Sequence, residues 1–157
     1  MSVPTPTGFR LWYPDAVDRA FLAPAEEFLR RWAQGDTHFT LHTSGSTGAP
    51  APIRVSRAQM IASAEGTIRF FGLGPQDRLL CALPLDKVAG QMMLVRALLL
   101  DCPLYLLPPR ANPAQELPED WPEAFDFVPW CRCRLPVSQR SRRPFFSAFG
   151  YCCWGEG

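Results

Sequence analysis

The most informative segment of the sequence is Thr43-Ser44-Gly45-Ser46-Thr47-Gly48. Its two glycines lack Cβ atoms, so the backbone can take positive φ values and approach an anion closely, and its four hydroxyl side chains can donate hydrogen bonds. Consecutive backbone N–H groups in such a turn form a nest for an anion. The segment therefore predicts a phosphate-binding loop, although a flexible Gly/Ser linker would have a similar composition.

The segments on either side of this loop favour phosphate binding over a linker. His38 to His42 alternates, with Phe39 and Leu41 on one face, which predicts a strand. After the loop, Ser56 is an expected helix N-cap and Gln59 completes a capping box. A loop between a strand and a helix is where α/β sheets bind ligands. The loop lacks the Lys of a Walker A motif and the first Gly of G-x-S-x-G, so neither of those sites is predicted.

Helical and strand periodicities alternate along the rest of the chain. One helix is predicted between an N-cap at Asp15 and Gly35, a second between Ser56 and Gly72, and a third after a cap at Asp86. Strands are predicted at 78–83, 103–107 and from 125 to 128, and 108–124 is expected to be an exposed loop. This alternation predicts an α/β fold with a mostly parallel sheet and flanking helices. The expected core positions on the helices are Phe21, Ala25, Phe28, Leu29, Trp32, Met60, Ile61, Ala64, Ile68, Phe71, Val88, Met92, Val95 and Leu99.

Length and composition exclude several function classes. The chain has 157 residues, of which 47% are hydrophobic and 20% charged, and its net charge is +1. This balance is typical of a globular domain and provides no electrostatic basis for binding nucleic acid or an anionic membrane. No apolar run is long enough to span a bilayer and the N-terminus lacks the pattern of a secretory signal, so the expected location is the cytoplasm.

The six cysteines predict neither disulfides nor a metal site. Cys81 and Cys102 lie in apolar segments, where a lone cysteine is usually a small buried hydrophobe. The other four lie between residues 129 and 157, at C-x-C and C-C spacings that differ from the C-x(2–4)-C spacing of zinc sites.

The loop and a second segment together resemble a known family. Residues 43–50 resemble the T-S-G-[ST]-T-G-x-P-K signature of the adenylate-forming (AMP-binding) enzymes, which include acyl-CoA synthetases, luciferases and peptide-synthetase adenylation domains. Residues 83–90, LPLDKVAG, resemble that family's L-P-L-x-H-x-x-G segment. With 52–55 and 91–98, they look most like the o-succinylbenzoate–CoA ligases of menaquinone biosynthesis. The resemblance covers residues 10–128.

The resemblance implies part of the N-terminal domain of such an enzyme and a two-step reaction. A carboxylate attacks the α-phosphorus of ATP to give an acyl-adenylate and pyrophosphate, and coenzyme A then displaces AMP to form a thioester. ATP, Mg²⁺ and coenzyme A are implied, with a small carboxylic acid as substrate. The resemblance also implies that Thr43, Ser44, Gly45, Ser46, Thr47 and Gly48 bind the β- and γ-phosphates, with Thr47 as a candidate Mg²⁺ contact.

Two positions depart from the family pattern. Ala51 stands where the signature has Lys, which removes a cation expected near the leaving pyrophosphate, and Arg54 is the candidate substitute. Lys87 stands where many members have His. It is either a phosphate or substrate contact or a solvated residue at the start of a helix.

Other functions stay open beside ligation. These 157 residues contain no Tyr-Gly-x-Thr-Glu motif for adenine and Mg²⁺, so we expect no catalysis by this chain alone and predict no catalytic residue. The alternatives are a non-catalytic nucleotide-binding or interaction fragment, a ligase for another aryl or acyl acid, and an unrelated phosphate-binding enzyme. The last would need an acid–base pair, whereas His38 and His42 alternate on a strand, where histidines are more often structural.

Residues 129–157 differ in character from the rest of the chain. They hold four of the six cysteines and five arginines, without helical or strand periodicity, and their six large aromatic side chains disfavour a disordered basic tail. We therefore expect a partial AMP-binding domain at 1–128, followed at 129–157 by a tail translated out of frame after a single-base deletion near codon 129. Sequencing the gene across that codon tests this hypothesis, because the next frame downstream should then encode more of the adenylation domain. A frame without such sequence contradicts it.

Overall fold

A computed structural model describes residues 2–4, 9–42, 52–110 and 117–129. The loop 43–48, Ala51 and the tail from residue 130 lie outside the described residues, so the predictions made for them are not tested. In chain order the elements are β1 (Ser2–Pro4), β2 (Arg10–Trp12), α1 (Arg19–Ala33), β3 (His38–His42), β4 (Pro52–Ser56), α2 (Arg57–Phe71), β5 (Leu79–Cys81), α3 (Val88–Leu100) and β6 (Leu104–Leu106).

Four strands form the main sheet, in the order β1-β2-β6-β5. The strands β2, β6 and β5 pair in parallel, with Leu79 opposite Leu104 and Leu80 opposite Tyr105, whereas β1 pairs antiparallel with β2. Every residue of β5 and β6 is buried, as expected for parallel strands that are covered on both faces. The predicted α/β fold with flanking helices is therefore confirmed.

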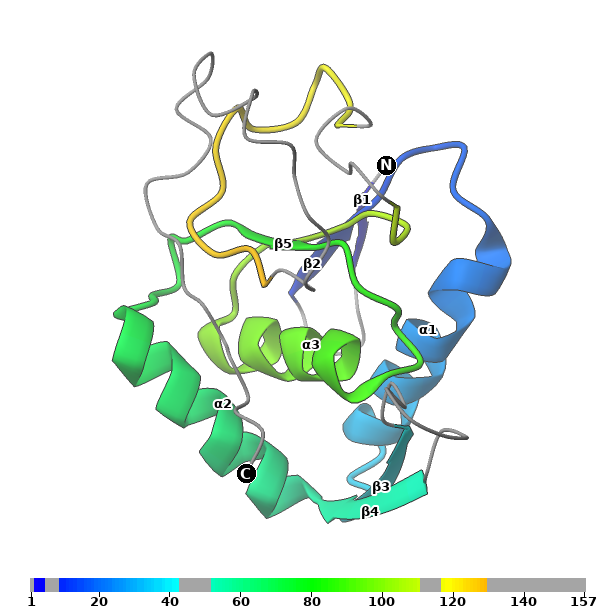
Figure 1. Cartoon of the computed structure of the whole chain (residues 1–157), viewed down its shortest axis with the longest axis vertical. Coiled ribbons are helices and arrows are strands. Elements are labelled where there is room, and N and C mark those ends of the chain that lie inside the picture. Colours follow the sequence, from blue (N-terminus) through cyan, green and yellow to red (C-terminus); the bar gives the residue numbers. More distant parts are fainter. Residues whose placement is uncertain (1, 5–8, 43–51, 111–116, 130–157) are drawn as a thin grey trace.

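The helix α3 covers one face of this sheet, with α1 and α2 on either side of it (Figure 1). On the opposite face, Tyr105 contacts Trp121 and Phe125 edge-on, with ring centroids 5.0 and 5.1 Å apart. The prediction of an exposed loop at 108–124 is wrong at Trp121, which is only 6% exposed. A side chain with that much apolar surface is stabilised by covering the sheet.

Among the described residues, no helix has the length and hydropathy to cross a bilayer.

The helix boundaries follow local capping chemistry. The predicted capping box of α2 is confirmed, because Gln59 N–H donates to Ser56 Oγ at 3.2 Å and Ser56 N–H donates to Gln59 Oε1 at 2.8 Å. The helix ends, as predicted, at Gly72, whose φ is 65°. The predicted start of α1 at Asp15 is wrong, since the carboxylate of Asp18 accepts the N–H of Ala20 at 2.9 Å and makes Asp18 the N-cap.

The start of α3 also differs from the prediction. Lys87, not Asp86, is the N-cap residue, and its side chain makes no capping hydrogen bond. The carboxylate of Asp86 instead pairs with Lys87 Nζ at 2.8 Å. Gly90, in the first turn, packs so closely that an added Cβ would lie 2.2 Å from the carbonyl oxygen of Pro84. A residue without a side chain is therefore required where α3 passes the segment that precedes it.

The strand β4, which periodicity did not predict, pairs antiparallel with β3 in a separate two-stranded sheet. His38 lies opposite Ser56 and His42 opposite Pro52. Residues 43–51 therefore connect two strands of a hairpin, and not a strand to a helix as we expected. Residues 125–128, where a strand was expected, make one parallel bridge, between Leu79 and Phe127.

The hairpin packs on α1 through aromatic rings. The predicted alternation of β3 is confirmed, with Phe39 and Leu41 buried. The ring of Phe39 lies 4.9 Å from that of Phe28 and 5.6 Å from that of Trp32, both on α1. These rings and Leu41 join the hairpin to the core that also contains α3.

Cys81 and Cys102 are buried free thiols, as predicted. Burial raises the pKa of each thiol to about 12. Both thiols are therefore protonated at neutral pH, and they act as small apolar side chains of the core and not as nucleophiles.

We expect Gly90→Ala to lower the free energy of unfolding by about 1–3 kcal/mol, because the new methyl group must displace the Pro84 backbone. Gly66→Ala is the matched control, since an added Cβ on α2 meets nothing within 4 Å. The better helix propensity of alanine should raise the stability of that variant by about 0.5–1 kcal/mol. Urea unfolding followed by circular dichroism measures both, and equal effects of the two changes would contradict the packing.

Phe39→Ala should lower the free energy of unfolding by about 3–5 kcal/mol, because it removes the ring that joins the hairpin to α1. The control is Thr40→Ala, on the exposed face of the same strand, with an expected change within about 0.5 kcal/mol. The same urea titration compares them. If Thr40→Ala lowered the free energy of unfolding as much as Phe39→Ala, the assignment of Phe39 to the buried face of β3 and Thr40 to its exposed face would be wrong.

Candidate functional site

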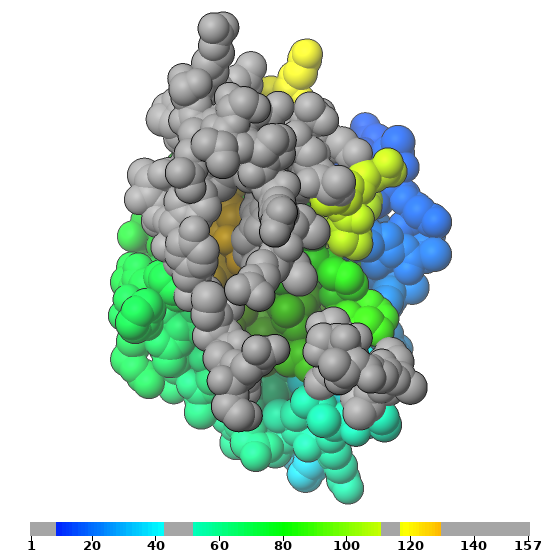
Figure 2. Space-filling model, viewed as in Figure 1, coloured from blue at the N-terminus to red at the C-terminus, as the bar shows by residue number. Residues whose placement is uncertain are grey.

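The candidate site is the end of the β3–β4 hairpin to which the loop 43–48 is attached. His42, the last residue of β3, directly precedes the loop, and Pro52, the first residue of β4, lies opposite His42. Figure 2 shows the hairpin (cyan) at one end of the molecule, next to the start of α2. The described residues thus fix where the loop leaves the fold and where it returns.

Lys87 lies beside this point. Its backbone pairs with that of His42 in an isolated parallel bridge, so the segment 83–90, which resembles one family motif, contacts the residue that directly precedes the loop. The Lys87 side chain is 27% exposed, and its Nζ is 2.8 Å from Asp86 Oδ2. Lys87 therefore lies at the start of a helix, as one interpretation expected, but it is partly buried and ion-paired, not fully solvated.

Arg54 lies on β4, opposite Thr40 and therefore two positions from the hairpin end. It is exposed, and the alternation of the strands places it on the same outer face as His42. Both predicted cationic contacts therefore lie near the hairpin end, Arg54 on β4 opposite Thr40 and Lys87 in a backbone bridge with His42 of β3.

The two histidines lie at opposite ends of β3, about 13 Å apart for a strand of this length. His38 Nδ1 is 3.0 Å from the hydroxyl of Thr37. This separation is too large for the pair to act on one proton, so these two histidines do not form together the acid–base pair that an unrelated phosphate-binding enzyme would need.

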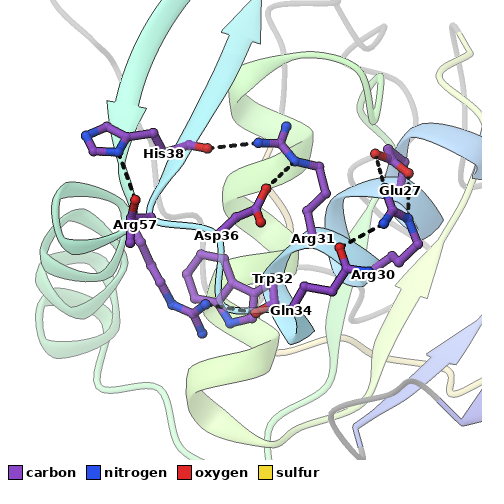
Figure 3. A network of polar contacts seen from close by, with 9 residues as sticks. Glu27, Arg30, Arg31, Trp32, Gln34, Asp36, His38 and Arg57 are labelled. Carbon is purple, nitrogen blue, oxygen red and sulfur yellow. Dashed lines mark hydrogen bonds and ion pairs between the residues drawn. The ribbon is translucent and has the colours of Figure 1, made fainter.

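Arg31 of α1 contacts the start of β3, at the end of the hairpin opposite the loop (Figure 3). Its Nε donates to Asp36 Oδ2 at 2.7 Å, and its Nη2 donates to the carbonyl oxygen of His38 at 2.9 Å. The guanidinium carbon also lies 5.0 Å from the centre of the Phe39 ring. Hydrogen bonds, charge and ring contact from one side chain therefore fix the start of β3 on α1.

Arg57 holds the second strand at the same end. Its Nη1 donates to the carbonyl oxygen of Trp32 at 2.8 Å, and its guanidinium carbon lies 4.1 Å from the centre of the Trp32 ring. Its backbone N–H donates to the carbonyl oxygen of Thr37 at 2.8 Å. Sequence reasoning missed Arg31 and Arg57, and the only signal near Arg57 was the N-cap that precedes it.

An open pocket of about 220 Å³ lies between the hairpin, α1 and the start of α3. Two acids line it, Glu27 and Asp86, and the pKa of Glu27 is lowered mainly by its hydrogen bond with Arg30. Within the described ranges, no three His, Cys, Asp or Glu side chains lie together as metal ligands would. The residues that line the pocket are Pro24, Glu27, Phe28, Arg31, Phe39, Thr40, His42, Asp86 and Gln91.

The chain is similar in sequence to several known enzymes. The chain is 38% identical over 66 residues to the 2-succinylbenzoate–CoA ligase of Enterococcus faecalis, a match that covers 42% of the chain and 14% of that protein. It is 27% identical over 99 residues to the enzyme of the same name from Listeria monocytogenes, covering 63% of the chain and 21% of that protein. The chain thus spans about a fifth or less of the length of these relatives.

A solved structure extends the likeness to the fold. The acyl-CoA synthetase (AMP-forming)/AMP-acid ligase II-like protein of Dyadobacter fermentans superposes with a TM-score of 0.65 at 43% identity, over 73% of this chain and 32% of that chain. Residues 12–129 match the AMP-binding enzyme family, and this range contains both motif segments and the whole hairpin. That match extends over more than half of this chain, and the chain therefore belongs to the AMP-binding enzyme family.

Proposed function

We propose that residues 43–48 bind the triphosphate of ATP, and that the chain is the ATP-binding part of an acid–CoA ligase that adenylates o-succinylbenzoate. The observation that carries the proposal is the backbone bridge between His42 and Lys87, which brings the segment 83–90 beside the residue that precedes the loop, with the Lys87 ammonium group paired to Asp86. The likeness to two 2-succinylbenzoate–CoA ligases, whose name denotes the same acid, supports the choice of substrate.

In this proposal the loop supplies hydrogen-bond donors to the β- and γ-phosphates. Mg²⁺ arrives with ATP, and Thr47 is its candidate contact. Lys87 and Arg54 provide the positive charge that Ala51 does not. Fixed positive charge and fixed donors stabilise the negative charge that develops on pyrophosphate as its bond to the α-phosphorus breaks, and they do so without reorganising solvent.

The acid and coenzyme A act in successive steps. A carboxylate oxygen of o-succinylbenzoate attacks the α-phosphorus, and pyrophosphate leaves. The thiolate of coenzyme A then attacks the acyl carbon, and AMP leaves with the electrons of the broken bond. We propose that these 157 residues bind the nucleotide but do not complete either step alone, since their sequence contains no Tyr-Gly-x-Thr-Glu motif.

Calorimetric titration of the whole chain with Mg·ATP tests the binding site. Gly45→Ala and Gly48→Ala should each weaken binding by about tenfold, because a Cβ restricts positive φ and keeps the backbone away from the phosphates. Gly66→Ala is the control, since that glycine lies on α2 with open space around it, and it should bind as the wild type does. Absence of binding in the wild type, or equal affinity in all four proteins, would refute the phosphate site.

Exchange of labelled pyrophosphate into ATP tests the chemistry separately. With o-succinylbenzoate and Mg·ATP, we expect no exchange above background from the chain alone. Exchange that requires the acid would overturn the proposed lack of turnover while supporting the proposed substrate.

A further inference from the structure

The pocket between the hairpin, α1 and the start of α3 has no role in the proposed function. Its volume of about 220 Å³ exceeds the roughly 150 Å³ of an apolar cavity that accommodates benzene. The side chains that line it all belong to described residues. The chemistry of the pocket therefore follows from described contacts alone, without the loop 43–48.

Apolar rings from α1 and the hairpin form part of the pocket wall. Phe28 of α1 and Phe39 of β3 both line it, with ring centroids 4.9 Å apart. Pro24, one turn before Phe28 on α1, adds a third ring. Aromatic rings pack favourably against one another in offset-stacked or edge-to-face arrangements, so this wall favours a flat aromatic ligand.

The charges around the pocket are balanced. Each acidic or basic side chain of its lining pairs with a neighbouring side chain of opposite charge. The pairs, with their N–O distances, are Glu27–Arg30 at 2.6 Å, Arg31–Asp36 at 2.7 Å and Asp86–Lys87 at 2.8 Å. A phosphate or a carboxylate needs an excess of positive charge, which these pairs do not leave, so the pocket favours a neutral molecule.

Gln91, near the start of α3, supplies a polar group. It lines the pocket, and within the described part of the chain its buried Oε1 accepts no hydrogen bond. Buried polar atoms in folded proteins almost always have a hydrogen-bond partner, so an unpaired oxygen on a residue that lines a pocket indicates a missing donor. A ligand that carries an N–H or O–H group can provide that donor.

We propose that this pocket binds a neutral aromatic molecule whose N–H or O–H group donates a hydrogen bond to Gln91 Oε1. Sites for small molecules are typically apolar, with a few polar groups that fix the orientation of the ligand. The pocket is a second site, and the proposal does not rest on phosphate binding by the loop.

Indole and 1-methylindole are suitable probes, because both are neutral aromatic rings and only indole has an N–H donor. Each is titrated into the ¹⁵N-labelled whole chain, and the amide chemical shifts report where it binds and how tightly. Indole should cause saturable shifts at Phe28, Thr40 and Gln91. The affinity for 1-methylindole should be about five- to tenfold lower, the loss that corresponds to one hydrogen bond.

Gln91→Met tests the acceptor, because methionine has a similar length but no carbonyl oxygen. This variant should bind indole as weakly as the wild type binds 1-methylindole, and should no longer distinguish the two probes. The matched control is Gln76→Met, which removes an exposed carboxamide that is not part of the pocket lining and should preserve the difference. Circular dichroism checks that both variants fold, and the two probes test the wild type even if Gln91→Met does not.

Three results would overturn the proposal: no saturable shift with indole, shifts centred on residues away from the pocket, or equal affinity of the wild type for the two probes. Shifts of the pocket amides that grow with protein concentration in the absence of a probe would assign the pocket to a second copy of the chain, and they would overturn it as well. Failure of Mg·ATP to bind would refute the proposed function and leave the result for this pocket unchanged.

Discussion

The packing of Phe39 between Phe28 and Trp32 is the contact on which the candidate site depends. The loop 43–48 is attached to a hairpin that belongs to a separate sheet, and the buried hairpin residues Phe39 and Leu41 lie in the same hydrophobic core as residues of β5, β6 and α3. Burial of the Phe39 ring against α1 contributes to the attachment of the hairpin to this core, at an expected gain of about 2–3 kcal/mol for a phenylalanine side chain. Because this contact is apolar, it sets the distance between the hairpin and α1 but only weakly sets their angle.

Directional contacts around that ring set the angle. Arg31 holds β3 through the His38 carbonyl, Arg57 holds β4 through the Trp32 carbonyl, and the backbone of Lys87 pairs with His42 at the other end. Hydrogen bonds to charged donors depend strongly on geometry, so each of these contacts restrains rotation. The hairpin is therefore held at both ends of β3 and at the start of α2, next to the last residue of β4.

Local chemistry explains which parts of this fold could be predicted from sequence. The capping box at Ser56 and Gln59 and the alternation of β3 are signals within a few residues, and both are confirmed. The strand β2 is three residues long and pairs with β6, more than 90 residues later in the chain. A strand this short has too few residues for a periodic pattern, so the sequence did not predict it. The strand β4 was missed because its outer face and most of its side chains are exposed. At the site, residues 43–50 and 83–90 were found by resemblance, whereas Arg31 and Arg57 act through carbonyl groups and rings that no spacing rule specifies.

The central claim is that the end of the hairpin binds a triphosphate beside Lys87. Amide chemical shifts of the ¹⁵N-labelled chain, recorded as Mg·ATP is added, test it most directly, because they report the binding position residue by residue. The account predicts the largest saturable shifts at Gly45, Ser46, Thr47 and Gly48, with smaller ones at His42 and Lys87 and none in β1 or at the exposed end of α2. Shifts centred on the pocket beside Glu27 and Gln91, or no saturable shift at all, would contradict it.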